Sequence, residues 1–328
     1  MPLISVVVCT HNRAVFLARC LAGLHSQELA PEQFEVIVVD DGSTDDTATV
    51  TADWARRMPN LRYVVESGRN LSLARNRGCQ AARGVWLAYI DDDAVPPPEH
   101  LARARQVIEA HAPDLLAGPV YPYYSSPKPH WFKDKYETKQ FVEVSGFSTT
   151  CRVTGANFMI KKDVLVRLGL FDPAYGMQGK RYVIGDERKV LEQYRAHTPA
   201  ERQKVYYALE CYVRHHVAAR KMTVRALLGR NYAGGRTMVR IFRDVKHIQP
   251  QGRNLVRQAW RWPGRLARAV RDQVRQHGLR GADYVEPLAL AWYDLGWIVE
   301  GGRQVLQRKL APWKPPTSAD QAETLTEQ

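Results

Sequence analysis

The chain has 328 residues, 45% of them hydrophobic, which is enough to bury a large core in one or two domains. Five scattered cysteines, with no pair at metal-binding spacing, argue against a disulfide-stapled fold and a zinc site, and fit a reducing compartment. The net charge is +13, but residues 214–309 hold 20 Lys and Arg against six Asp and Glu, while the rest is nearly neutral. This asymmetry predicts an anionic surface or a phosphorylated molecule as a partner.

Strand and helix patterns alternate through the first 120 residues. Strands are expected over residues 3–9, 35–39, 61–65 and 85–90, and residues 115–120 close the series. Helices are expected over residues 14–26, from the Ser43-Thr44-Asp45 cap to about Arg57, and over 70–82 and 98–111. This alternation predicts an α/β fold with a mostly parallel, Rossmann-like sheet flanked by helices on both faces.

The pattern after residue 120 is less regular. Residues 121–150 are rich in Pro, Tyr and Lys and are expected to be irregular, followed by a strand over 151–161. A loop over 171–185, a helix over 187–196 and a strand over 205–215 are expected next. A basic helical region over 221–311 follows, with breaks near Pro250 and Gly278, and residues 312–328 are expected to be a disordered tail.

No targeting or membrane-spanning segment is evident in this sequence. The first apolar run, residues 3–9, lacks a preceding basic segment and ends in a polar turn, unlike a secretory signal. The longest later candidate, residues 287–299, is shorter than the ~20 residues that cross a bilayer and contains Asp294. We therefore expect a cytoplasmic protein, free or peripheral at the inner face of the cell membrane. A homo-oligomer is left open.

Polar side chains follow three of the expected strands. They are Thr10-His11-Asn12-Arg13, Asp40-Asp41-Gly42-Ser43 and Asp91-Asp92-Asp93. Ligands of parallel sheets bind beyond the carboxyl ends of the strands, so these residues are expected to share one crevice. Three adjacent aspartates repel one another, and Mg²⁺ or Mn²⁺, which prefer oxygen ligands, would relieve that repulsion. The alternative is a solvated acidic turn that caps the next helix.

A family resemblance is carried by four segments, PLISVVVCTHNR, FEVIVVDDGSTDDT, LSLARNRG and VWLAYIDDDAVPPPEHL. In this order and spacing they resemble inverting glycosyltransferases of family 2, of the kind that builds bacterial polysaccharides and glycans, which have the GT-A fold. The resemblance covers residues 1–120 closely and about 150–220 more loosely. It implies a catalytic domain over residues 1–220, with a nucleotide-binding half up to about 120 and an acceptor half over 121–220.

The resemblance assigns the nucleotide-binding residues one by one. Thr10 and His11 would line the base pocket, with His11 stacking on the base, and Arg13 belongs to the same nucleotide site. Asp41 would accept a hydrogen bond from the base, most simply the N3–H of uracil or thymine. A UDP-sugar is therefore the preferred donor, with dTDP- and GDP-sugars left open.

Further positions follow from the same resemblance. Asp92 would hold the ribose, and Arg75 of the ARN triplet would face the nucleotide or its phosphates. Asp91 is assigned to the donor and acceptor pocket, together with Asn157 of GANFMI, a segment that resembles a family motif lining the donor sugar. A plain strand entry is the alternative for GANFMI, and a surface helix arginine is the alternative for Arg75.

The resemblance also implies a divalent metal, Mn²⁺ or Mg²⁺, that bridges the two phosphates of the donor. Asp93 would bind it, and a histidine of YVRHHVAARKMT would complete the metal shell or contact the diphosphate. We prefer His215 to His216 for this position, although a His-His pair taken alone is more often structural. A metal held by carboxylates neutralises the negative charge that develops on the leaving diphosphate.

An inverting displacement needs a general base that takes the proton of the acceptor hydroxyl. The segment FDPAYGMQGKRYVIGDERKVLEQY resembles the acidic motif of the family, which lies at a helix start after a glycine-rich loop. Asp186 and Glu187 are the candidates, and Glu187 is preferred because it takes the second position. The order here, Asp then Glu, reverses the one more often found in relatives. The alternative is a pair of acids that only favours the helix N-terminus.

The arginines of the C-terminal region recur at three- or four-residue steps, at Arg253, Arg257, Arg261, Arg265, Arg268, Arg271 and Arg275. Pro263 is expected to break this helix or to start a new one. Apolar residues lie between the arginines, and Trp260 and Trp262 are amphipathic anchors. Residues 250–310 are expected either to lie on a membrane surface, near a lipid-linked acceptor, or to pack on the catalytic domain or a second subunit.

Other nucleotide-using enzymes are the main alternative. A dehydrogenase would show G-x-G-x-x-G after the first strand and a nucleotidyltransferase a glycine-rich basic loop, whereas this chain has Thr-His-Asn-Arg there. A nucleic-acid-binding protein that uses the arginine-rich helices is a distant alternative, unsupported by any known motif. We therefore expect a hexosyltransferase-type glycosyltransferase with a glycan, lipid-linked or other hydroxyl acceptor, and no nucleic acid as a partner.

Overall fold

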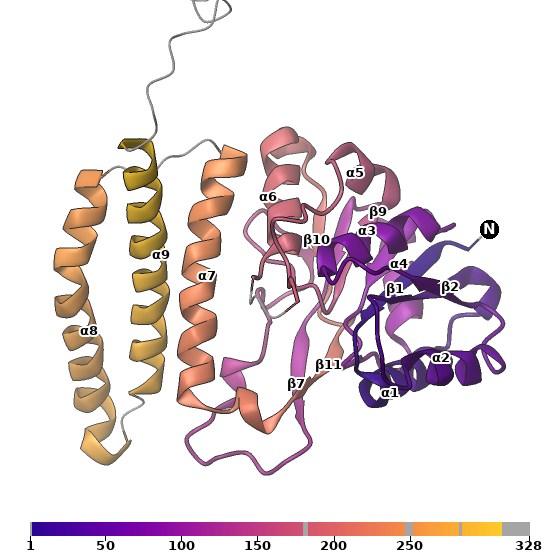
Figure 1. Ribbon diagram of the computed structural model, residues 1–328, viewed down its shortest axis with the longest axis horizontal. Helices are drawn as coiled ribbons and strands as arrows, with labels where there is room; N and C mark the ends of the chain where they lie inside the picture. Colours follow the sequence, from indigo (N-terminus) through magenta and orange to yellow (C-terminus); the bar gives the residue numbers. More distant parts are fainter. Residues whose placement is uncertain (1, 180–182, 247–251, 282–283, 310–328) are drawn as a thin grey trace, which may run out of the picture.

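The computed structural model describes residues 2–179, 183–246, 252–281 and 284–309 (Figure 1). The tail expected over residues 312–328 lies outside these residues. A layered α/β unit is followed by three long helices that stand side by side at one flank of it. None of the helices in the described part of the chain is apolar enough over a sufficient length to cross a membrane.

The strands form two sheets. The larger is built from β1 (Ile4–Thr10), β2 (Phe34–Asp40), β3 (Leu61–Val65), β4 (Trp86–Tyr89), β6 (Leu115–Ala117), β8 (Gly146–Phe147), β9 (Phe158–Lys161) and β10 (Val205–Tyr207). Its strand order is β3-β2-β1-β4-β9-β6-β10-β8. The first four of these strands are parallel, and β9 runs antiparallel between β4 and β6. A smaller sheet has the order β5-β11-β7, from β5 (Ala94–Val95), β7 (Val120–Tyr124) and β11 (Val213–Val217).

Helices cover both faces of the larger sheet. They are α1 (Ala14–His25), α2 (Thr47–Ala55), α3 (Leu71–Ala81), α4 (His100–His111), α5 (Lys162–Arg167) and α6 (Asp186–His197). Val6 and Val8 of β1 pack in one core cluster with Leu17 of α1, while Val7 packs in the other cluster with Ala74 of α3. Successive side chains of a strand point to opposite faces, so the continuous apolar runs of β1 and β2 are those of strands buried on both sides. This confirms the predicted α/β architecture.

Three predicted strands have different bounds. The strand expected over residues 205–215 is wrong as one element, because a turn in which Cys211 N–H donates to Ala208 O (3.2 Å) carries the chain from β10 to β11. The strand expected over 151–161 is reduced to β9, because Thr154 and Asn157 pair across a tight turn. The strand expected over 115–120 stops at Ala117, and residues 120–124, part of which we expected to be irregular, form β7 in the second sheet.

The C-terminal region consists of α7 (Val224–Lys246), α8 (Gly252–Gly281) and α9 (Val285–Lys309). The breaks predicted at Pro263 and Gly278 are wrong, because α8 runs through both positions; Pro250 lies outside the described residues. Trp262, beside the proline, ties this part of α8 to α9 by donating its indole N–H to Ala291 O (2.7 Å). Helix α9 lies between α7 and α8 (Figure 1).

Helices α7 and α9 approach each other closely. A Cβ at Gly235 of α7 would lie 1.9 Å from Tyr293 O, so only glycine allows this crossing. The side chain of Glu300 is fully buried and accepts hydrogen bonds from Arg236 and Arg240 of α7 and from Arg303 of α9. Burial alone would raise the pKa of Glu300, but these arginines lower it to about 2. Three arginines of the C-terminal region therefore pair with a buried carboxylate inside it, an arrangement that the sequence did not predict.

Candidate functional site

The carboxyl ends of β1, β2 and β4 meet at one edge of the larger sheet. Thr10 pairs with Asp40 in the β1–β2 register, and Val7 pairs with Tyr89 of β4. The residues just after these strands therefore lie beside one another, as the parallel pattern predicts. They surround a cavity of about 310 Å³, which we call the strand-end cavity, lined by Cys9, Thr10, His11, Arg13, Asp41, Arg69, Leu71, Ala74, Asp91, Asp92, Met177 and Gly179.

Asp41 supplies an unused acceptor in the strand-end cavity. The residue is 7% exposed, and its Oδ1 has no hydrogen-bond partner among the described residues. Burial raises the pKa of this carboxyl above its usual range. The ring of His11 is held nearby by a hydrogen bond between Nδ1 and the Asp41 carbonyl oxygen (2.8 Å). An orphaned buried acceptor beside a fixed aromatic ring suits a planar ligand with an N–H donor.

Asp92 is the most constrained carboxylate of the cavity. Thr10 Oγ1 donates to its Oδ2 (2.8 Å), and Arg13 Nη1 contacts its Oδ1 (2.9 Å). Burial nevertheless raises the pKa of Asp92 to about 7, because desolvation outweighs the attraction of Arg13 and the neighbouring Asp93 adds repulsion. Arg13 also pairs with Asp93, so one guanidinium bridges two consecutive acids.

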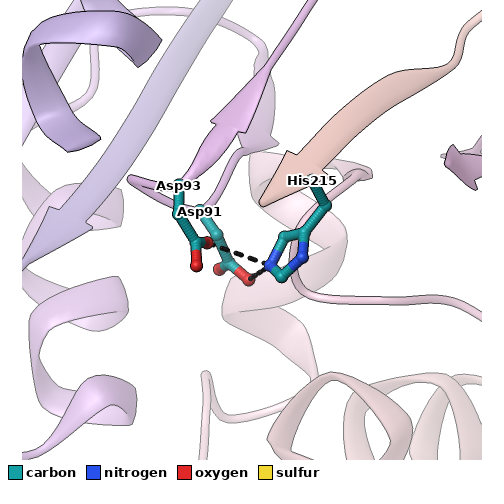
Figure 2. Close-up of side chains that lie close together, drawn as sticks. All are labelled: Asp91, Asp93 and His215. Atoms are coloured by element: carbon teal, nitrogen blue, oxygen red, sulfur yellow. Dashed lines mark ion pairs between the residues drawn. The ribbon is translucent and has the colours of Figure 1, made fainter. Parts of the chain in front are cut away.

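Asp91, Asp93 and His215 form a cluster that can hold a metal ion (Figure 2). Their ligand atoms all lie within 4.8 Å of one another. His215 Nε2 is 2.9 Å from Asp93 Oδ1 and 3.8 Å from Asp91 Oδ2. Two carboxylates and one imidazole are a donor set that suits Mn²⁺ and is compatible with Mg²⁺. The two aspartates follow β4 and the histidine lies in β11, so the cluster joins the ends of the two sheets.

Three basic side chains surround Asp93 within the described residues. They are His215, Arg13 and Lys221, whose Nζ lies 3.7 Å from Asp93 Oδ2. Burial alone would raise the pKa of Asp93, but the hydrogen bond from His215 and the surrounding positive charges hold it well below its usual range. Asp93 therefore stays ionised, as a metal ligand must. Lys221 was missed in the sequence, because a lysine at the end of a loosely matched segment carries no signal of its own.

His216, the neighbour of His215, points elsewhere. Its Nε2 lies 2.7 Å from Ser125 Oγ, and its ring packs on Phe16 with centroids 4.6 Å apart. Alternation along β11 puts the two histidines on opposite faces of the smaller sheet. The geometry therefore favours His215 for the cluster.

Arg75 organises a second group of acids. Its Nη1 lies 2.6 Å from Asp186 Oδ2 and 3.9 Å from Glu187 Oε2, and its Nη2 lies 3.3 Å from Asp91 Oδ1. The guanidinium is buried, and a Cβ at Gly155 would come within 2.1 Å of it, so this position excludes any side chain. Arg75 therefore links the start of α6 to the cluster of Asp91, Asp93 and His215, a role that its place in α3 does not reveal.

Asp186 and Glu187 differ in their surroundings. Burial would raise the pKa of Asp186, but Arg75 holds it below its usual range. Burial raises the pKa of Glu187 well above the usual range, and the negative charge of Asp186 adds to that shift. The Asp186 side chain is 3% exposed and that of Glu187 is 19% exposed, so Glu187 is the more accessible acid.

Both acids open into a second cavity of about 220 Å³, which we call the loop cavity. It is lined by Leu71, Arg75, Asp91, Val120, Glu137, Lys139, Thr154, Gly155, Ala156, Gly176, Met177, Val183, Ile184, Gly185, Asp186, Glu187 and His215. Leu71, Asp91 and Met177 line both cavities, so the two cavities adjoin at these residues. Met177 and Lys139 carry no motif, and sequence reasoning did not find them.

The placement of Asn157 in the pocket is wrong. Its side-chain amide is buried and donates to Pro119 O (3.0 Å) and to Cys211 O (2.7 Å). These bonds tie β9 to the chain segments that enter β7 and β11, and Asn157 lines neither cavity. The preceding residues of the motif, Gly155 and Ala156, are the ones that line the loop cavity.

Comparison with known proteins places this geometry in a family. The model described as glycosyl transferase family 2 matches residues 5–169. Validoxylamine A glucosyltransferase from Streptomyces hygroscopicus subsp. limoneus is 40% identical over 114 residues, which are 34% of this chain and 24% of that protein. The match therefore spans about a quarter of that relative's own length.

Two solved structures are similar over nearly the whole chain. S. aureus TarS 1–349 in complex with UDP has a TM-score of 0.54 at 14% identity, covering 97% of this chain and 95% of that one. The mannosyltransferase PcManGT from Pyrobaculum calidifontis in complex with GDP-Man and Mn²⁺ has a TM-score of 0.54 at 18% identity, covering 99% and 80%. At these identities the similarity shows the fold, which is GT-A. With half of its length matched by the family model, the chain belongs to glycosyltransferase family 2.

Proposed function

We propose that this protein is an inverting glycosyltransferase that moves a sugar from a nucleotide-diphosphate sugar to a hydroxyl acceptor. The observation that carries the proposal is the position of Asp91, which lines both cavities and belongs to the cluster with Asp93 and His215. A nucleotide in the strand-end cavity would have its diphosphate beside this cluster. Its sugar would then face the loop cavity, where Asp186 and Glu187 lie.

For the donor we propose a UDP-sugar. The unpartnered Oδ1 of Asp41 supports a hydrogen bond from the N3–H of uracil, and the fixed ring of His11 supports stacking on the base. Asp92, held by Thr10 and Arg13, supports a contact to the ribose. Guanine also carries a ring N–H, and one structural neighbour is in complex with GDP-Man. GDP is therefore the nucleotide to compare with UDP in binding experiments.

The metal is proposed to be Mn²⁺ or Mg²⁺ at Asp91, Asp93 and His215. When bound, such an ion supplies the positive charge that stabilises a leaving diphosphate. Arg13 and Lys221 already neutralise Asp93 from the other side, so they would add to the positive potential around the phosphates.

Glu187 is proposed as the general base. In the transfer step the acceptor oxygen forms a bond to the anomeric carbon while the bond from that carbon to the diphosphate oxygen breaks. The acceptor proton passes to the Glu187 carboxylate. Asp186 lies 2.6 Å from the Arg75 guanidinium, and this close ion pair supports a positioning role for Asp186. Glu187 is more accessible and lies further from the same guanidinium, at 3.9 Å, which supports its role as the base.

For the acceptor we propose a hydroxyl of a glycan or a lipid-linked sugar, in polysaccharide or glycan synthesis in the cytoplasm. Glu137 and Lys139 in the wall of the loop cavity support a polar acceptor, since both are charged hydrogen-bonding groups. The basic C-terminal region supports an anionic surface near the enzyme.

The test is thermal stabilisation by nucleoside diphosphates in the presence of Mn²⁺. A true ligand at 100 times its Kd adds about 2.7 kcal/mol to the free energy of unfolding, which raises the melting temperature by several degrees. We expect UDP with Mn²⁺ to do so and UDP with a chelator to do much less. If no nucleoside diphosphate stabilises the protein with metal, the proposal fails. A nucleotidyltransferase would instead be stabilised by a nucleoside triphosphate and would release pyrophosphate.

A further inference from the structure

Helix α8 is the outermost element of the C-terminal region. It packs on α9, and α9 in turn packs on α7, which adjoins the α/β unit (Figure 1). Within the described part of the chain, the side of α8 that faces away from α9 has no element packed over it. The side chains on this uncovered side of α8 are therefore available to contact a partner.

The uncovered side of α8 is strongly basic. Residues 252–281 contain eight arginines and one aspartate. Six of these arginines are exposed, namely Arg257, Arg261, Arg265, Arg268, Arg271 and Arg275, and we call them the arginine face. At about 100° per residue they fall within an arc of about 120°, so they form one strip along the helix.

The arginine face has few counter-charges of its own: Asp272, the one acid among residues 252–281, forms no ion pair with it among the described residues. Arg265 pairs with Asp294 of α9 (3.3 Å). The other five arginines have no carboxylate partner among the residues that the structure describes. Contrast the buried Glu300, which gathers three arginines inside the same helical region. Like charges along one helix face repel one another, and an external anionic partner would relieve that repulsion.

An aromatic anchor lies at the edge of the arginine face. Trp260 is 83% exposed, and on the helix it lies about 20° outside the arc of the arginines. Trp262, two residues further on, points the other way and is bonded to α9. The apolar side chains Leu266, Val270 and Val274 are only half-buried against α9. Basic side chains with an exposed tryptophan at the border of an incompletely covered apolar stripe are typical of helices at a lipid–water interface.

The shape of the strip favours a flat partner. From Arg257 to Arg275 the arginine face is about 27 Å long, at about 1.5 Å per residue along a continuous helix. A flat anionic surface contacts the whole strip at once. We propose that the arginine face, with Trp260 at its edge, docks this protein on the surface of a membrane that contains anionic lipids. This goes beyond the transfer reaction and is independent of it.

The experiment is flotation of the full chain with vesicles, without any sugar nucleotide. We expect binding to vesicles of 70% phosphatidylcholine and 30% phosphatidylglycerol, little binding to pure phosphatidylcholine, and loss of binding at 0.5 M NaCl because salt screens exposed charges. Arg257→Gln, Arg261→Gln and Arg268→Gln together should lower the partition coefficient on the order of a hundredfold. Trp260→Ala should lower it about tenfold.

The matched control removes three exposed arginines of the α/β unit, by Arg57→Gln, Arg83→Gln and Arg103→Gln. It has the same net charge as the triple variant of α8 and should bind vesicles like the unmodified protein. An equal loss of vesicle binding in both triple variants would overturn the proposed docking face, because net charge alone would then explain the binding. Displacement of the protein from vesicles by stoichiometric amounts of a mixed-sequence oligonucleotide would also overturn it. So would an oligomer, detected by light scattering, that dissociates in the α8 triple variant but not in the control. Because no substrate is present, none of these outcomes depends on the proposed reaction.

Discussion

The strand-end cavity and the loop cavity share Leu71, Asp91 and Met177, but they are assembled in different ways. The polar groups of the strand-end cavity follow β1, β2 and β4, so the parallel pairing of these strands brings them together. Asp186 and Glu187 of the loop cavity come from the start of α6 and are held through Arg75 of α3. The nucleotide and metal chemistry proposed here thus depends on local sheet geometry, whereas the proton chemistry depends on a long-range ion pair.

The largest loss is expected in the cluster of Asp91, Asp93 and His215. Asp93→Ala should lower turnover on the order of a thousandfold and remove its dependence on Mn²⁺, because it removes a proposed metal ligand that Arg13 and Lys221 also contact. The measurement is the initial rate of sugar transfer across a Mn²⁺ titration and in chelator. Asp163→Ala, at an exposed acid of α5, is the control and should turn over normally. Unimpaired turnover of the Asp93 variant in chelator would remove the metal from the mechanism.

On the loop-cavity side, Glu187→Gln should stop transfer without weakening nucleotide binding. We expect kcat to fall on the order of a hundred- to ten-thousandfold, while the Kd for UDP with Mn²⁺ stays within about twofold. The comparison variant is Asp186→Asn, which leaves buried Arg75 short of a partner and should cost about 3 kcal/mol of stability. If Asp186→Asn abolishes transfer in a protein that remains folded and Glu187→Gln does not, Asp186 is the base.

The pH dependence gives a second readout at Glu187. A base must be ionised, so kcat should rise as the pH passes upward through the pKa of Glu187, which burial raises above that of an ordinary glutamate. The folded state binds this proton more tightly than the unfolded chain, so the contribution of Glu187 to stability falls as the pH rises through the same pKa. Glu187→Gln should therefore raise the melting temperature at pH 8.

The sequence predicts the strand-end cavity better than the loop cavity. The strands and their polar ends were predictable, because continuous β-branched runs and a parallel sheet place Thr10, Asp41 and Asp91 at one edge. The partners of Arg75 and Lys221 were not, because they depend on how α6 and β11 return to the first strands. Asn157 was misplaced for the same reason: its amide satisfies two carbonyls of segments far along the chain.

The sequence predicted that the C-terminal region is helical, but not where its helices end. Pro263 predicts a break from local backbone chemistry alone, yet contact with α9 allows α8 to continue through it. Nor does the sequence reveal that α7 supports the loop before α6. Tyr175, in the loop before α6, donates its hydroxyl to Asp244 of α7 (2.6 Å), and Thr237 of α7 donates to Ile184 O (3.1 Å).

The smallest effect is expected from cutting this support. Tyr175→Phe removes a hydrogen bond to a carboxylate, which contributes about 1.5–3 kcal/mol when it is buried and less in a loop that can relax. Met177 and Gly179 of the same loop line the strand-end cavity, so a looser loop should weaken donor binding more than the chemical step. We expect the donor KM to rise about tenfold, equivalent to about 1.4 kcal/mol, with kcat nearly unchanged.

The matched control is Tyr124→Phe, which removes the same kind of bond, from a tyrosine hydroxyl to Asp134 (2.7 Å), at a place outside both cavities. It should leave both kinetic constants unchanged. Asp244→Asn should resemble Tyr175→Phe, because it weakens the same contact from the α7 side. A fall in kcat with an unchanged donor KM would mean that α7 acts on Glu187 through Gly185 rather than on the donor, and the two cavities would then be coupled more tightly than their separate assembly suggests.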